Sequence, residues 1–257
     1  MQLVRRTTTQ VSEWVRREPS DEAAARLFCL PYSGCGATMY RFWPRFAGAV
    51  EICPVQLPGR ESRFSEPHYG TIERLADQLV DGLARYLDRP FAFFGHCGSA
   101  LTAYEASVRL GERGLPAAAN VFVSSQVAPH QGPYGRFLEL DDDGLRAEIR
   151  KLTAETGGEL VEDLIDLYLE ILRADIEANK RYRRDAVRLG HPVTAIGWDQ
   201  DAEVAYSLMT GWADCGDTRF VLLQGPHYTF LQAPPALLDV VEAGLLGAPR
   251  TAGAEPA

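Results

Sequence analysis

The sequence has little positive charge and no apolar run long enough to span a membrane. Its 257 residues carry a formal net charge of −9, so no segment offers the basic face that would neutralise a nucleic-acid backbone. Arg5 and Arg6 are basic, but residues 7–17 contain no apolar block that could serve as a signal peptide. These absences argue against nucleic acid and membranes as partners and predict a protein that stays in the cytoplasm.

Cysteine is also scarce, and its spacing excludes the usual cysteine-based frameworks. The five cysteines are an odd number and lack the paired spacing of a metal site. They are Cys29, Cys35, Cys53, Cys97 and Cys215. We therefore expect reduced thiols, as in a cytoplasm, and no metal.

The sequence is rich in short apolar runs of strand length that alternate with helical patterns. Hydrophobic residues make up 46% of the chain. Between the runs, apolar residues from Ile72 to Leu87 recur at helical period and form one face. The predicted strands are residues 26–30, 51–57, 91–95, 120–125, 192–198 and 219–224. This alternation predicts an α/β fold with a mostly parallel central sheet that helices cover on both sides.

The order of elements also predicts the domain organisation. Residues 1–22 are polar and form an expected loose lead-in, residues 23–247 form the domain, and residues 248–257 form a tail. Residues 131–190 contain no clear strand and are predicted to be an inserted helical lid. The second lid helix, expected at 160–172, is apolar nearly all round, which is typical of a helix covering both a core and a hydrophobic substrate chamber.

The stretch from Phe93 to Ala100 carries the strongest functional signal. An apolar strand runs into a sharp turn of small residues with Cys97 at its apex, and a helix follows. In a Gly-x-Ser-x-Gly elbow, the nucleophile occupies such a strained strand-to-helix turn. The pattern predicts Cys97 as a nucleophile, and the alternative is a degenerate, noncatalytic elbow.

A cysteine nucleophile needs a base, and the base needs an acid that orients it. His227 directly follows the last predicted strand, and Asp201 lies just past the strand before it. Both groups would project at the carboxyl edge of the sheet beside Cys97, in the chain order nucleophile, acid, histidine. Asp199 is a nearby alternative to Asp201. For the oxyanion, the backbone N–H groups of Gly98 and Ser33 are the candidate donors.

Together these segments resemble the type II, stand-alone thioesterases of polyketide and nonribosomal peptide biosynthesis. The resemblance covers Leu27 to Leu231. It rests on Phe28–Gly34 with Trp43, on Val55–Glu61, on the elbow, on Leu172–Asp175 with Tyr182, and on Gly225–Leu231. It implies an α/β-hydrolase fold with a helical lid, no cofactor, and removal of acyl groups from the phosphopantetheine arm of acyl or peptidyl carrier proteins. The family's Asp and His fall on Asp201 and His227, and a monomer is the expected state.

The chain departs from that family pattern at four positions. Cys97 replaces the nucleophilic serine, Gly98 the methionine, Ser99 the closing glycine, and Pro226 the glycine before the histidine. A cysteine would hold the acyl group as another thioester, which stays activated for a second acceptor. Hydrolysis is the favoured prediction; the alternatives are acyl transfer or cyclisation from Cys97, and a noncatalytic carrier-binding module.

Overall fold

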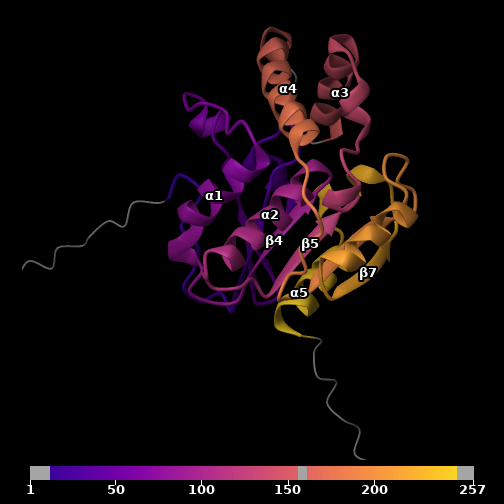
Figure 1. Cartoon of the computed structure of the whole chain (residues 1–257). Helices are drawn as coiled ribbons and strands as arrows, with labels where there is room; N and C mark the ends of the chain where they lie inside the picture. The colour runs from indigo at the N-terminus through magenta and orange to yellow at the C-terminus, as the bar shows by residue number, and fades with distance from the viewer. Residues whose placement is uncertain (1–11, 156–160, 248–257) are drawn as a thin grey trace, which may run out of the picture.

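The computed structural model describes residues 12–155 and 161–247, which fold around one seven-stranded sheet (Figure 1). The strand order is β2-β3-β1-β4-β5-β6-β7, and only β2 is antiparallel to its neighbour. The strands are β1 Ala25–Cys29, β2 Phe46–Ala47, β3 Val50–Pro54, β4 Phe91–His96, β5 Asn120–Ser124, β6 Val193–Trp198 and β7 Thr218–Leu223. The mostly parallel sheet and the six predicted strands are confirmed, with ends shifted by at most three residues. The two-residue edge strand β2 was not predicted.

Helices cover both faces of this sheet, as a parallel sheet requires. On β4, Phe93 belongs to the hydrophobic cluster under α1 (Ile72–Leu83) and α2 (Gly98–Glu112), whereas Phe94 belongs to the cluster under α5 (Pro235–Leu246). Short 3-10 helices complete the described chain: η1 Ala37–Phe42, η2 Glu61–Arg63, η3 Ala84–Tyr86, η4 Pro129–Gln131, η5 Arg136–Glu139, η6 Glu162–Leu164, η7 Tyr206–Cys215 and η8 His227–Gln232. The two cores therefore hold the strand ends in fixed positions.

Two longer helices, α3 (Asp142–Glu155) and α4 (Ile165–Arg181), lie between β5 and β6 in the sequence. They stand side by side at one end of the molecule, beyond the sheet (Figure 1). Asp141 starts α3 by accepting a hydrogen bond of 2.9 Å from the N–H of Gly144. α4 continues well past its predicted end at Leu172. The predicted start of that helix, Leu160, lies outside the described residues.

The N-terminal segment is not loose where the structure describes it, which corrects the expectation for residues 12–22. Trp14 and Val15 are buried, and Val15 forms a β-bridge with Val55. The indole of Trp14 lies so close to Gly82 of α1 that a Cβ on this glycine would be 2.2 Å from it. Buried apolar residues, together with polar contacts such as that between Glu18 and the hydroxyl of Tyr86, thus dock this segment on the domain. The remaining lead-in residues and the tail lie outside the described residues.

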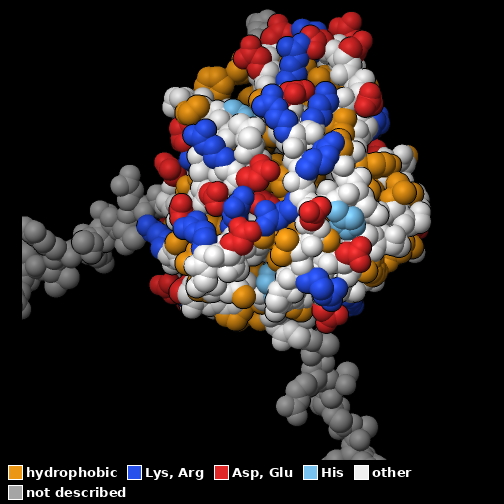
Figure 2. Space-filling view, in the orientation of Figure 1, with side chains coloured by type: hydrophobic (Ala, Val, Ile, Leu, Met, Phe, Trp, Pro, Cys, Tyr) orange, Lys and Arg blue, Asp and Glu red, His pale blue; other side chains and the backbone are white. Residues whose placement is uncertain are grey.

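The surface carries charges of both signs. On the face in Figure 2, Lys and Arg side chains are interspersed with Asp and Glu. Within residues 12–155 and 161–247, every helix is too short or too polar to cross a lipid bilayer.

Candidate active site

Cys97 forms the turn between β4 and α2, in a backbone conformation that side chains rarely adopt. Its φ is +54° and its ψ is −133°, which costs about 1–3 kcal/mol in a residue other than glycine. The N–H of Cys97 donates to the carbonyl of Ser124 at 2.8 Å and so fixes the turn to β5. Gly95 must lack a side chain, because a Cβ there would lie 2.3 Å from the carbonyl oxygen of Ser99. This geometry is that of a nucleophile elbow.

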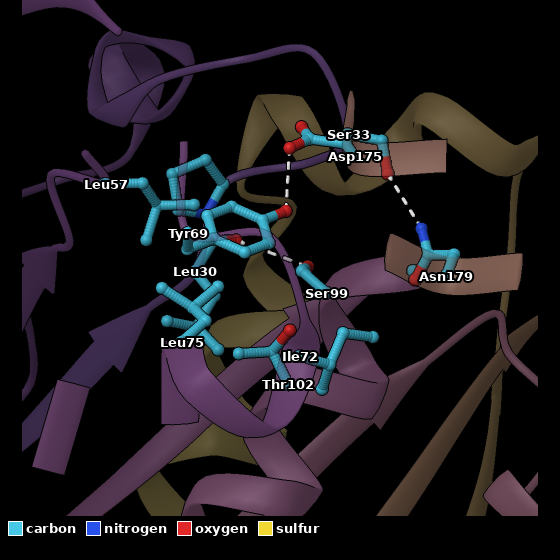
Figure 3. Close-up of a pocket in the computed structure, with 12 residues that line it drawn as sticks. Leu30, Ser33, Leu57, Tyr69, Ile72, Leu75, Ser99, Thr102, Asp175 and Asn179 are labelled. Carbon is cyan, nitrogen blue, oxygen red and sulfur yellow. Dashed lines mark hydrogen bonds between the residues drawn. The ribbon is translucent and has the colours of Figure 1, made fainter. Parts of the chain in front are cut away.

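Ser99, which stands where the resembling family has a glycine, reinforces the elbow. Its hydroxyl accepts a hydrogen bond of 3.0 Å from the N–H of His96. The same oxygen lies 3.4 Å from the carbonyl of Leu30 on the neighbouring strand's end (Figure 3). His96 is fully buried, its Nδ1 lies 2.9 Å from the Ser124 hydroxyl, and burial lowers its pKa.

His227 and Asp201 form a buried pair. Nδ1 of His227 lies 2.9 Å from Oδ2 of Asp201, and their side chains are 4% and 0% exposed. The Ser125 hydroxyl donates to the same Oδ2 at 2.7 Å, and the N–H groups of Glu203 and Val204 donate to Oδ1 at 2.8 and 3.0 Å. The carboxylate is thereby locked with one oxygen facing the imidazole.

Asp199, the alternative acid, instead binds the backbone of a neighbouring loop. It lies on an exposed turn, and its Oδ1 accepts a hydrogen bond of 2.8 Å from the N–H of Gly225. That bond holds the segment before His227. Of the two candidate acids, the structure brings only Asp201 against the imidazole.

The surroundings of His227 favour its protonated form. Burial alone lowers the pKa of the imidazole, but the hydrogen bond to Asp201 and the interaction with the Cys97 side chain outweigh it and raise the pKa to about 10. The pKa of Asp201 is lowered, because its hydrogen bond to His227 outweighs the effect of burial. Cys97 is therefore next to an imidazolium at neutral pH, the setting that activates cysteine nucleophiles.

The candidate oxyanion donors come from two different loops. Gly98 is the first residue of α2, where N–H groups have no partner within the helix. Ser33 lies in the loop after β1. Both line one narrow cleft with Cys97, and its volume of about 20 Å³ has room for a single water-sized group. An acyl carbonyl in this cleft would lie among these donors.

Comparison with known proteins gives the family. A family model described as "Thioesterase domain" matches residues 25–245. The chain belongs to the thioesterase family. Linear gramicidin dehydrogenase LgrE of Brevibacillus parabrevis is 32% identical over 253 residues, 94% of this chain and 96% of that protein. Thioesterase PikA5 of Streptomyces venezuelae is 34% identical over 204 residues, 77% of this chain and 73% of that protein.

A solved structure agrees with this membership in sequence and in fold. The type II thioesterase BorB from the borrelidin biosynthetic cluster is 31% identical, with a TM-score of 0.76, covering 92% of this chain and 99% of that one. The name of LgrE refers to a dehydrogenase, whereas the family model, PikA5 and BorB all carry thioesterase in their names. The α/β-hydrolase fold expected from the sequence is confirmed.

Asn179, on α4, is a site residue of this thioesterase that sequence reasoning missed. A Cβ on Gly98 would lie 2.5 Å from Nδ2 of Asn179, so the carboxamide occupies the space that a side chain at position 98 would take. Its Nδ2 points toward the Ser33 hydroxyl at 3.5 Å (Figure 3). Thus a lid helix places an amide over both candidate oxyanion residues.

Glu203 is a second missed residue, and it approaches the other nitrogen of the imidazole. Its Oε2 lies 3.6 Å from Nε2 of His227, and its side chain is 10% exposed. Glu203 also lines the Cys97 cleft. No sequence signal marked it, because only the turn at Asp201 brings it against His227.

A buried ion pair connects the lid of the thioesterase to the loop that carries Ser33. Asp175 of α4 and Arg60 are joined by two hydrogen bonds of 2.8 Å, and both side chains are at most 3% exposed. Asp175 also accepts from the N–H of Gly34 at 2.8 Å and from the hydroxyl of Tyr69 at 2.6 Å (Figure 3). His68 Nε2 lies 2.7 Å from the same carboxylate. Arg60 holds the pKa of Asp175 well below its usual range, although burial opposes this.

A larger cavity of about 450 Å³ lies beneath the two lid helices. Ser33 and Phe137 line both this chamber and the Cys97 cleft. Its walls are mostly apolar and include Met39, Phe64, Ile149, Leu152, Leu167, Tyr168, Ile171 and Leu172. α4 therefore presents apolar residues to the chamber as well as to the core. Among the described residues, no group of three His, Cys, Asp or Glu side chains is arranged to hold a metal.

Proposed function

We propose that this thioesterase takes acyl or aminoacyl groups from the phosphopantetheine arms of acyl or peptidyl carrier proteins onto Cys97 and releases them by hydrolysis. The observation that carries the proposal is the cysteine on a strained elbow beside the buried His227–Asp201 pair. The thioesterase names of PikA5 and BorB, and the biosynthetic cluster named for BorB, support the substrate class. We assign Cys97 the role of nucleophile, His227 that of acid and base, and Asp201 that of the orienting acid.

In the first step, the Cys97 thiolate attacks the carbonyl carbon of the carrier-bound thioester. The oxyanion that forms accepts hydrogen bonds from the N–H groups of Gly98 and Ser33, each good donor contributing about 3–4 kcal/mol. The bond to the pantetheine sulfur then breaks, and this sulfur takes the proton from Nε2 of His227. The products are acylated Cys97, a free carrier thiol and a neutral imidazole.

In the second step, water attacks the acyl group on Cys97. Neutral His227 takes a proton from the water through Nε2, and the same two N–H groups stabilise the new oxyanion. Cys97 leaves as a thiolate, and the carboxylic acid departs. Since the cleft at Cys97 admits only a water-sized group, the rest of the acyl chain would lie in the chamber beneath α3 and α4.

Acyl transfer is a second candidate function, and the thiol at position 97 is the observation that favours it. A serine ester is less activated than the thioester it comes from, whereas a Cys97 thioester retains that activation. A second carrier thiol, an amine or a hydroxyl could therefore attack acylated Cys97 in place of water. We further propose a monomer in a reducing cytoplasm, where the five cysteines, all free in the described structure, would stay reduced.

Intact mass spectrometry with hexanoyl-N-acetylcysteamine, a small analogue of a pantetheine thioester, tests the proposal. We expect the protein to gain one hexanoyl group and the Cys97→Ala variant to gain none. Cys35→Ala is the matched control, since Cys35 lines the chamber but not the cleft, and it should be acylated like the parent. Equal labelling of Cys97→Ala and the parent would refute Cys97 as the nucleophile.

The product decides between the candidate functions. Free hexanoic acid as the only product supports hydrolysis, whereas hexanoyl groups on an added thiol acceptor support transfer. No acylation, together with Cys97 reacting with iodoacetamide no faster than the other thiols, would favour a noncatalytic carrier-binding module.

A further inference from the structure

His227 is flanked by carboxylates on both of its ring nitrogens. Asp201 lies on Nδ1 at 2.9 Å and Glu203 lies on Nε2 at 3.6 Å. The first contact is the expected one in a nucleophile–histidine–acid arrangement. The second is unexpected, because Nε2 is the atom that must give and take protons at the substrate. Apart from its interaction with the Cys97 side chain, Nε2 makes no hydrogen bond within the described part of the chain, so it can exchange protons with a substrate.

Two hydrogen bonds fix the backbone of Glu203. Its backbone N–H donates to Asp201 at 2.8 Å, and its carbonyl accepts from the Tyr134 hydroxyl at 3.2 Å. Arg136 lies 3.5 Å from Oε1 of Glu203, but it also contacts Glu148 and is 38% exposed. The partly hydrated guanidinium of Arg136 is shared between two carboxylates. It therefore does not fully neutralise Glu203, whose negative charge still favours the protonated imidazole of His227.

The other groups around His227 do not cancel this charge. His96 packs edge-on against the imidazole, with ring centroids 4.4 Å apart, and burial keeps it neutral. Tyr32 and Tyr228 contribute neutral rings, because burial raises the pKa of both phenols. Once Cys97 is acylated, its thiolate is gone, and Asp201 and Glu203 are the anions that remain in contact with the imidazole.

We propose that Glu203 is a positioning residue that holds His227 as an imidazolium through Nε2 and thereby slows release of the acyl group to water relative to thiol acceptors. The inference rests on the proposed function, in which Cys97 carries the acyl group. Water must lose a proton to neutral Nε2 as it attacks, so a protonated imidazole blocks hydrolysis.

A thiol acceptor escapes this block. Its ordinary pKa of about 8.5 supplies some thiolate at neutral pH. That thiolate attacks the acyl carbon directly, and Cys97 leaves as a thiolate that the imidazolium stabilises. Glu203 thus shifts the partition of acylated Cys97 from hydrolysis toward transfer to a thiol, although it does not contact the substrate.

The histidine can be examined directly by NMR titration in a Cys97→Ser background, which lacks the thiolate as the acyl-enzyme does. The His227 signal is identified by its absence in Cys97→Ser/His227→Gln. We expect Glu203→Gln to lower the titration midpoint by about one pH unit or more, since an opposite charge at this distance shifts a pKa by about 1–3 units. Glu203→Asp should lower it less. Glu177→Gln, the control, removes an exposed carboxylate that pairs with Lys180 on α4 and should cause the smallest change.

Product partition provides the functional measurement. Protein acylated with hexanoyl-N-acetylcysteamine is given a thiol acceptor at pH 7, and hexanoic acid and transferred hexanoyl are both quantified. We expect Glu203→Gln to raise the ratio of acid to transferred product several-fold. Circular dichroism and thermal unfolding check that each variant is folded.

The outcomes distinguish failure of the proposed role of Glu203 from failure of the proposed function of Cys97. Acylation of Cys97 with an unchanged His227 midpoint, or with an unchanged product ratio, overturns the role of Glu203 and leaves the proposed function standing. Failure of the parent protein to become acylated overturns both.

Discussion

Gly98 and Asn179 share a single space beside Cys97, the proposed nucleophile. Gly98 is a proposed oxyanion donor through its backbone N–H, and an amide from α4 fills the space where its side chain would be. The carboxamide from α4 thus fills the space that a side chain at position 98 would take, so we expect the two positions to be coupled.

Restoring methionine at position 98 tests this coupling. We expect Gly98→Met to displace Asn179 and to lower kcat/KM for hexanoyl-N-acetylcysteamine by roughly tenfold, because the donors around the oxyanion shift. Gly98→Met/Asn179→Ala should recover much of that loss. Gly111→Met is the control, since no atom lies within 4 Å of a Cβ at this second α2 glycine. Equal losses in the single and double variants would contradict the coupling.

The raised pKa of His227 makes part of the stability depend on pH. Because the folded-state pKa of about 10 exceeds the unfolded value of about 6.5, the folded protein binds more protons between these limits. The stability contributed by His227 is thus complete below pH 6.5 and is lost as the pH rises through about 10. Urea unfolding of the parent and of His227→Gln should show a free-energy difference that shrinks over this range. A constant difference would argue against the raised pKa.

At the scale of elements, α4 connects the wall of the chamber to the loop that carries Ser33. Asp175 binds Arg60 and the backbone of Gly34, one residue after the candidate donor Ser33. About two turns of one helix, from Leu167 to Asp175, thus connect the chamber wall to the loop of Ser33. Its anchor is a buried charge, which is costly to leave without its partner.

Asp175→Asn tests the anchor. It leaves Arg60 buried and unpaired, so we expect the free energy of unfolding to fall by about 3–5 kcal/mol. Glu177→Gln on the same helix removes an exposed partner of Lys180 and should cost less than about 1 kcal/mol. Urea denaturation of both variants gives the comparison. A loss for Asp175→Asn no greater than that for Glu177→Gln would show that the buried pair does not anchor α4.

Elements that have a clear local sequence pattern could be predicted, and elements that depend on contacts with distant residues could not. The elbow around Cys97 was readable because an apolar strand and a small-residue turn are adjacent in the chain. β2 has only two residues, too few for a periodic signal. The end of α4 was missed because Arg173 and Lys180 interrupt its apolar pattern while the backbone continues in helical form.

The same limit applies to the candidate site. Asp201 and Asp199 are two residues apart, and only the fold decides which of them contacts His227. Asn179 meets Gly98 from a helix far along the chain, and Ser125 meets Asp201 from another strand end. Such contacts leave no spacing signal in a single sequence.

At the scale of the whole molecule, the chamber beneath α3 and α4 should limit the size of the acyl group. We expect Ile171→Trp, which fills the chamber, to raise KM for long acyl thioesters by about tenfold and to leave short ones nearly unchanged. Glu170→Trp, on the exposed side of the same helix, is the control. A series of N-acetylcysteamine thioesters of increasing length provides the measurement. Equal effects on all chain lengths would exclude this chamber as the acyl site.

The ion pair between Asp175 and Arg60 also limits which parts of α3 and α4 could move to open the chamber. If the whole of α4 moved outward, Arg60 would lose its partner and remain buried and unpaired. α3 and the turns of α4 that precede Asp175 are the parts that could move without breaking the Asp175–Arg60 ion pair. An opening of this kind would leave Asn179 and the loop of Ser33 and Gly34 in place.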